Sequence, residues 1–116
     1  ERAQELAFEH LREKAPCQAV HQAVQEFFKQ EGYTTGRHNG QMRGFFHGTG
    51  HGIGLDLHEA PRLSAHSPDR LAAGHVVTVE PGLYYPDLGG VRLEDVAWIT
   101  LNGWRNLTKF EKIFEV

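Results

Sequence analysis

The chain has one cysteine, no long hydrophobic run and no excess of positive charge, and each shortage excludes a class of protein. The single Cys17 excludes an internal disulfide and a zinc finger, and it suits a reducing compartment such as the cytoplasm. No hydrophobic run approaches the roughly 20 residues of a transmembrane helix, and the charged first residues do not resemble a secretory signal. Twelve Lys and Arg against fifteen Asp and Glu give a net charge of −3, which argues against nucleic-acid or membrane partners.

The hydrophobic pattern predicts two helices in residues 1–32. In the first, apolar residues recur at helical spacing, and Pro16 then suits the start of the second. The second has an apolar face over residues 17–28, and Gly32 is expected to end it. The predicted buried positions of the first helix are Ala3, Leu6, Ala7, His10 and Leu11.

Strand-like patterns dominate the rest of the chain. The polar segment 34–43 is expected to be a loop, and Asn102-Gly103 is typical of a tight turn between strands. Helices followed by an antiparallel sheet define an α+β fold, with residues 45–116 as the sheet and 1–116 as one domain. The predicted strands cover residues 75–80, 83–85, 91–100, 104–107 and 112–116.

Histidine and glycine are concentrated together in the middle of the chain. His47, His51 and His58 lie within twelve residues and are separated by four glycines. Glycine lets the backbone fold closely around a small site, and imidazole is both a metal ligand and a proton carrier near neutral pH. The segment therefore indicates a metal or catalytic cluster, or else a glycine-rich loop with surface histidines. Its glycines argue against the helical His-Glu-x-x-His motif.

Two carboxylates stand in or beside predicted strands. Glu80 ends an otherwise apolar strand, and Glu94 lies within the segment 91–100. A carboxylate in a buried strand is costly unless it is paired or bound to a metal. Arg92 lies two residues before Glu94 and shares its strand face, so an Arg92–Glu94 ion pair is the alternative to metal binding.

Segments 47–61, 78–82 and 90–95 resemble, in order and spacing, the three signature blocks of the pita-bread metallopeptidases, in the branch of aminopeptidase P and prolidase. The resemblance implies the C-terminal half of a pita-bread domain and an enzyme that hydrolyses Xaa-Pro peptide bonds. Such an enzyme takes peptides with proline at the second position and uses two divalent metal ions, Mn²⁺, Co²⁺ or Zn²⁺. It also implies a homodimer in the cytoplasm. Prolidase and aminopeptidase P are not separated by these motifs.

By this resemblance His51, Glu80 and Glu94 would bind metal, with Glu94 bridging both ions. The family's metal centre has five protein ligands, two of which are aspartates on strands before the helices. No aspartate precedes Asp56 in this chain. We therefore expect the C-terminal part of a longer enzyme, with Glu80 and Glu94 on an open face of the sheet and little activity by itself.

The resemblance also implies catalytic and substrate-binding roles. Glu80 would accept a proton from the attacking water, and His58 would donate to the carbonyl oxygen under attack. His47 would line the substrate pocket, and Arg92 would contact substrate or pair with Glu94.

Two other functions are compatible with the fold. One is a pita-bread pseudoenzyme that binds a peptide or protein, and the other is a metal-free hydrolase of the creatinase kind. Both have little need of the full ligand set, whereas His51, Glu80 and Glu94 are all present here. The sequence therefore favours the metallopeptidase.

Overall fold

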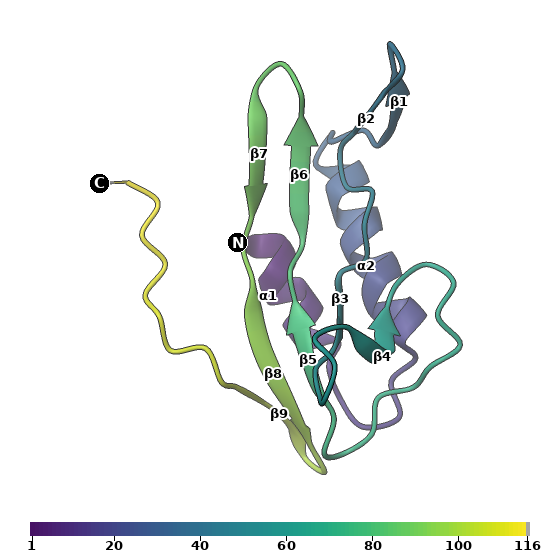
Figure 1. Ribbon diagram of the computed structural model, residues 1–116, viewed down its shortest axis with the longest axis vertical. Helices are drawn as coiled ribbons and strands as arrows, with labels where there is room; N and C mark the ends of the chain where they lie inside the picture. The colour runs from purple at the N-terminus through teal and green to yellow at the C-terminus, as the bar shows by residue number, and fades with distance from the viewer. Residues whose placement is uncertain (116) are drawn as a thin grey trace.

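The computed structural model describes residues 1–115 and contains, within them, two helices followed by nine short strands (Figure 1). Neither helix is long or apolar enough to cross a membrane. The elements are α1 (Arg2–Glu9), α2 (Cys17–Gln30), β1 (Gly36–His38), β2 (Gln41–Arg43), β3 (Gly50–Gly52), β4 (Glu59–Leu63), β5 (Val76–Val79), β6 (Gly82–Tyr85), β7 (Gly89–Arg92), β8 (Asp95–Thr100) and β9 (Gly103–Asn106).

The strands form one antiparallel sheet of five strands and two hairpins. The large sheet has the order β4-β3-β5-β8-β9, and the hairpins are β1–β2 and β6–β7. The β6–β7 hairpin continues beyond the ends of β5 and β8, as Figure 1 shows. Helix α1 packs against β5, and α2 packs against β4.

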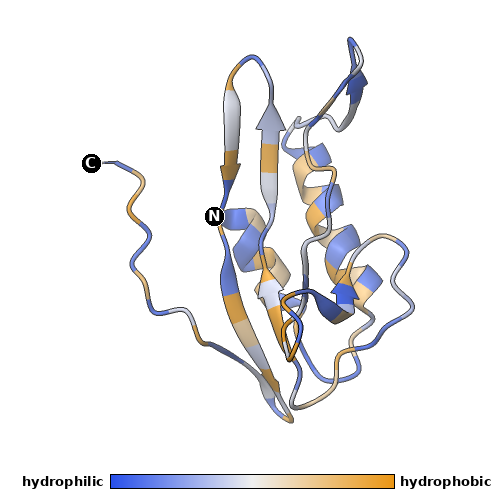
Figure 2. Ribbon diagram, viewed as in Figure 1, coloured by the Kyte–Doolittle hydropathy of each residue, from blue (hydrophilic) through white to orange (hydrophobic). Residues whose placement is uncertain are grey.

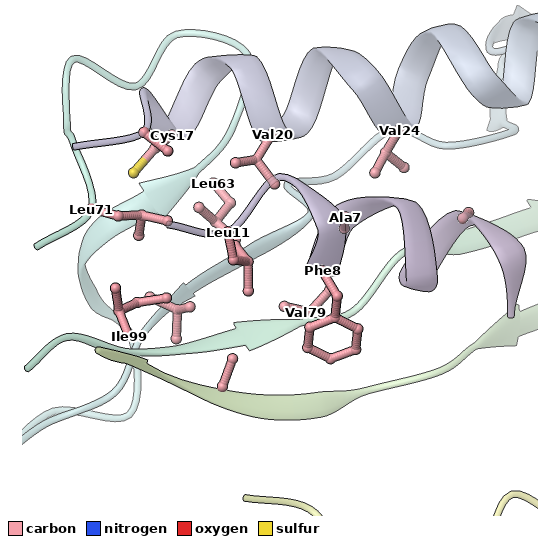
Figure 3. Close-up of a cluster of buried hydrophobic side chains, with 14 of the residues drawn as sticks. Ala7, Phe8, Leu11, Cys17, Val20, Val24, Leu63, Leu71, Val79 and Ile99 are labelled. Carbon is pink, nitrogen blue, oxygen red and sulfur yellow. The ribbon is translucent and has the colours of Figure 1, made fainter. Parts of the chain in front are cut away.

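The core lies between the helices and one face of the large sheet. Val77 and Val79 on β5 and Ala97 and Ile99 on β8 are fully buried on this face. Figure 3 shows side chains of both helices gathered against this part of the sheet. The strand period of two places Thr78 and Trp98 on the opposite face. Because each helix buries only one face in this core, both helices carry hydrophobic residues (orange) as well as hydrophilic ones (blue) in Figure 2.

Helix α1 is where expected, but its buried face differs from the predicted one. Gln4 and Phe8 are buried, whereas Leu6 and His10 are only half-buried. The Gln4 amide donates to the carbonyl oxygens of Val79 and Leu93, at 2.9 and 3.3 Å. Hydrogen bonding removes most of the cost of burying this amide, and hydrophobicity alone does not predict such a residue in a core.

The expected loop at residues 34–43 is wrong, because this segment contains the β1–β2 hairpin. Asn39 and Gly40 both have positive φ, at 48° and 80°, as a type I′ turn requires. The Asn-Gly pair is a strong hairpin signal, which the polarity of the segment concealed.

The expected strand 91–100 is two strands. Its first part, β7, pairs with β6, and its second part, β8, pairs with β5 and β9. All four residues of β7 are exposed, whereas burial alternates along β8, so the segment behaves as one strand only in its backbone direction. The expected strand 112–116 is also wrong: residues 112–115 form no strand, and Val116 lies outside the described residues.

Candidate metal and substrate site

His51 and Glu80 meet on the face of the sheet that carries Thr78. His51 lies on β3, Glu80 follows β5, and His51 Nε2 is 3.1 Å from Glu80 Oε1. Thr78 holds both residues, because its hydroxyl donates to Glu80 Oε1 at 2.9 Å and accepts from the His51 amide at 3.0 Å. Both side chains are mostly buried, at 13% and 14% exposure.

The tautomer of His51 suits a cation at this point. Its Nδ1 is 3.0 Å from the carbonyl oxygen of Gly52, and because a carbonyl only accepts, Nδ1 carries a proton. Nε2 is the ring nitrogen that faces Glu80 Oε1, where it can donate to the carboxylate from a protonated ring or share a cation with it. A metal-binding histidine usually donates its other N–H to a carbonyl in this way. The pair therefore fits two ligands of one divalent ion.

Arg92 lies between the two predicted carboxylate ligands. Its Nε is 3.8 Å from Glu80 Oε2 and 3.7 Å from Glu94 Oε2. The Arg92–Glu94 pair considered from the sequence is therefore present, and Arg92 reaches Glu80 as well. Within residues 1–115, no group of three or more His, Cys, Asp or Glu side chains is arranged to hold a metal ion. Glu94 is thus joined to the His51–Glu80 pair through a guanidinium.

Tyr84 connects His47 to this cluster and was not predicted from the sequence. Its hydroxyl donates to His47 Nε2 at 3.0 Å, because His47 Nδ1 faces the carbonyl of Gly48 and carries the proton. A hydrogen bond with Tyr84, and then the charges of nearby acidic groups, raise the pKa of Arg92.

Two glycines, Gly82 and Gly90, leave the space that the Tyr84 side chain occupies. A Cβ at Gly82 would lie 2.6 Å from the Tyr84 hydroxyl, and one at Gly90 would lie 2.6 Å from the ring. Tyr84 and Gly90 are register partners in the β6–β7 hairpin. A tyrosine paired with a glycine across a hairpin was the signal that could have identified this residue.

His58 completes the cluster. Its ring centre is 4.4 Å from that of His51, and the residue is exposed. His58 therefore contacts His51, and His51 contacts Glu80. Arg92 contacts both Glu80 and Glu94. Tyr84 joins His47 to Arg92. The six residues named from the sequence lie in one cluster on the sheet, and their individual roles stay predictions.

A buried histidine that the sequence interpretation did not single out lies beneath this cluster. His21 on α2 is 3% exposed, and its Nδ1 shares a hydrogen bond of 3.0 Å with the Thr49 hydroxyl. Burial lowers the pKa of His21 to about 4, with smaller contributions from His47 and His66. The His21 ring is therefore neutral at pH 7.

This depressed pKa predicts acid-sensitive folding. Below pH 6.5 the unfolded chain protonates His21, whereas the folded chain resists protonation until about pH 4. The free energy of unfolding should therefore fall by about 3 kcal/mol over this interval as pH is lowered. Urea unfolding at pH 7, 5.5 and 4.5 measures the fall, and His21→Gln, which cannot titrate, should remove most of it. Equal falls in both proteins would contradict the prediction.

Comparison with known proteins places this cluster in a family of metallopeptidases. Residues 1–101 match metallopeptidase family M24, and the chain belongs to this family. The chain is 41% identical to the Xaa-Pro dipeptidase of Pyrococcus furiosus over 110 residues, which are 95% of this chain and 29% of that protein. It is 52% identical to the Xaa-Pro dipeptidase of Pyrococcus horikoshii over 68 residues, which are 59% of this chain and 19% of that protein.

Solved structures give the same result. The chain superposes on the prolidase from Pyrococcus furiosus with a TM-score of 0.84 and 40% identity, over 96% of this chain and 31% of that one. The chain superposes on the X-Pro aminopeptidase from Thermotoga maritima with a TM-score of 0.82 and 32% identity, over 95% of this chain and 29% of that one. The chain thus spans less than a third of the length of these relatives. The predicted fold class, two helices and an antiparallel sheet of the pita-bread type, is confirmed.

Proposed function

We propose that this chain supplies the metal-binding and substrate-facing sheet of a metal-dependent Xaa-Pro peptidase. The observation that carries the proposal is the His51–Glu80 pair, in which Nε2 and Oε1 lie 3.1 Å apart while Nδ1 of the same ring is held by the Gly52 carbonyl. The pair stands in a member of family M24 whose relatives are named Xaa-Pro dipeptidases. The proposed substrate is a peptide with proline at the second position.

The metal chemistry assigns distinct roles to three side chains. His51 and Glu80 would bind one divalent ion, and Glu94 would join them once Arg92 gives up its contact with Glu80. Mn²⁺, Co²⁺ and Zn²⁺ all suit one imidazole with carboxylates. Two bound ions would polarise the scissile carbonyl and lower the pKa of the attacking water. Glu80 would accept the proton of that water.

The remaining residues of the cluster would handle the peptide. His58, exposed above His51, would donate to the carbonyl oxygen as charge develops on it. His47 and Arg92 would contact the substrate, and Tyr84 would hold both of them in place. The homodimer and the cytoplasmic location stay predictions of the family resemblance.

A peptide-binding pseudoenzyme is the second candidate function. It is favoured by the position of Arg92, whose single positive charge lies between Glu80 and Glu94 and offsets part of their negative charge without a metal. In that case the cluster would bind a peptide through Arg92, His47 and Tyr84. Binding of an Xaa-Pro peptide in EDTA, together with failure to bind Mn²⁺, would favour this function over the peptidase.

Metal binding to the purified chain tests the main proposal. We expect weak binding of one Mn²⁺ ion, because among the described residues 1–115 only His51 and Glu80 are placed to share it. His51→Ala and Glu80→Gln should each weaken binding at least tenfold, which isothermal titration calorimetry would measure. His38→Ala is the matched control, because His38 is exposed on the β1–β2 hairpin, and it should leave binding unchanged. Equal affinities in all four proteins would contradict the proposed site.

Hydrolysis of an Xaa-Pro dipeptide by the same chain with Mn²⁺ should be negligible. The expected reason is the absence of the two aspartate ligands implied by the family resemblance. Rapid turnover with two tightly bound ions would show that these ligands are not needed or come from a second chain.

A further inference from the structure

The buried side chain of Thr49 fixes the segment that carries His47 and His51. Between His47 and His51 the chain reads Gly48-Thr49-Gly50, so Thr49 alone has a side chain there. Thr49 is fully buried, its amide donates to the Leu63 carbonyl, and its carbonyl accepts from the Glu80 amide, each at 2.7 Å. The position of Thr49 therefore sets the distance from His47 to Glu80 as well as to His51.

The Thr49 hydroxyl has its hydrogen-bonding partner on helix α2. It shares the 3.0 Å bond with His21 Nδ1, and His21 is 3% exposed. The His21 ring also packs on Phe45 at 5.3 Å between centres, and Phe45 packs edge-on against His47 at 5.2 Å. His21 thus contacts both flanks of His47, although it lies on a helix and far away in sequence.

We infer that His21 is a positioning residue, whose imidazole holds Thr49 and Phe45 and so sets the place of His47 relative to the His51–Glu80 pair. The relevance of this placement to metal and substrate rests on the proposed function, whereas the placement itself does not. An apolar residue would fill the same volume but leave the Thr49 hydroxyl buried without a partner, which costs more than the bond contributes.

Amide hydrogen exchange on the purified chain can separate positioning from general stability. The Glu80 amide reports on the segment, because it donates to the Thr49 carbonyl. The Ile99 amide, bonded to the His75 carbonyl, reports on the body of the sheet. His21→Leu and Thr49→Val each remove the His21–Thr49 bond. Each should speed exchange at Glu80 about tenfold and at Ile99 less than about twofold, as loss of one buried hydrogen bond predicts.

Three further variants make the result specific. His21→Gln and Thr49→Ser keep hydrogen-bonding groups and should restore slow exchange at Glu80. The double variant His21→Leu/Thr49→Val should be no worse than either single one, because both remove the same bond. Val24→Ala, at a fully buried position on the same helix, should speed exchange at Glu80 and Ile99 alike.

Mn²⁺ affinity links the result to function. In His21→Leu and Thr49→Val it should fall about tenfold, with recovery in His21→Gln. If the unaltered chain binds no Mn²⁺, the proposed function fails for this chain, and exchange at Glu80 alone decides the role of His21. Equal acceleration at Glu80 and Ile99 in His21→Leu, or none at Glu80, would overturn the inference.

Discussion

Gly50→Ala is expected to destabilise the large sheet strongly, and far more than the same change at Gly48 just before β3. A Cβ at Gly50 would lie 1.8 Å from the carbonyl oxygen of Thr78 and 2.7 Å from its carbonyl carbon. Both atoms belong to the backbone of β5, which cannot move away without breaking its pairing with β8. The expected loss is at least about 3 kcal/mol, beyond the usual cost of overpacking because the obstacle is backbone. That is a large part of the stability of a small domain.

Gly48→Ala provides the matched control for this prediction. Gly48 lies two residues earlier, and its added Cβ would come no closer than 3.1 Å to the Leu63 carbonyl oxygen. We expect a loss below about 1.5 kcal/mol there, measured by urea unfolding of both variants. Gly50→Ala should also displace His51 from Thr78 and so weaken Mn²⁺ binding. Similar losses in the two variants would show that close contact with β5 is not what requires glycine at position 50.

The parts of the fold that the sequence predicted correctly depend on local patterns. Both helices and the strand at β5 follow from apolar spacing and from the residues that flank each element. The tight turn before β9 was also expected, but its two residues are Leu101 and Asn102, one position earlier than predicted. Strands β3 and β4 were not predicted. Both are short and contain glycine or proline, and the pairing register shifts between His51 and Gly52 on β3, so neither shows clean alternation.

The candidate site was predicted in part for a different reason. His47, His51, His58, Glu80, Arg92 and Glu94 were named by their resemblance to family motifs, which record contacts between distant segments. Tyr84 and His21 were missed, because the first is placed by a glycine across a hairpin and the second by a helix packed beneath the sheet. The Tyr84–Gly90 pair could have been found from the sequence once the hairpin register was known, whereas the packing of His21 leaves no local pattern. The ion contacts of Arg92 with both glutamates also required the three-dimensional arrangement.

The second large effect is expected at the segment after β9, whose described residues form no strand but are held by an ion pair between a partly exposed lysine and a buried carboxylate. Asp95 is 4% exposed at the start of β8, and Lys112 Nζ lies 3.0 Å from its Oδ2. Asn106 donates to the same carboxylate oxygen at 3.1 Å, and Lys112 also donates to Gln4 Oε1 at 2.6 Å. Lys112 is thus a nearby positive charge that compensates a buried carboxylate.

Lys112→Met should therefore lower the free energy of unfolding by about 3–5 kcal/mol, because it leaves the Asp95 charge buried without its counter-ion. Lys109→Met, at an exposed lysine of the same segment, should cost less than about 0.5 kcal/mol. The double variant Asp95→Asn/Lys112→Met removes both charges and should recover more than half of the loss, since the unpaired charge is the main cost. Urea unfolding of these proteins at pH 7 measures each value. If Lys112→Met is no more destabilised than Lys109→Met, water reaches Asp95 in place of the lysine, and the segment does not stabilise the sheet through this pair.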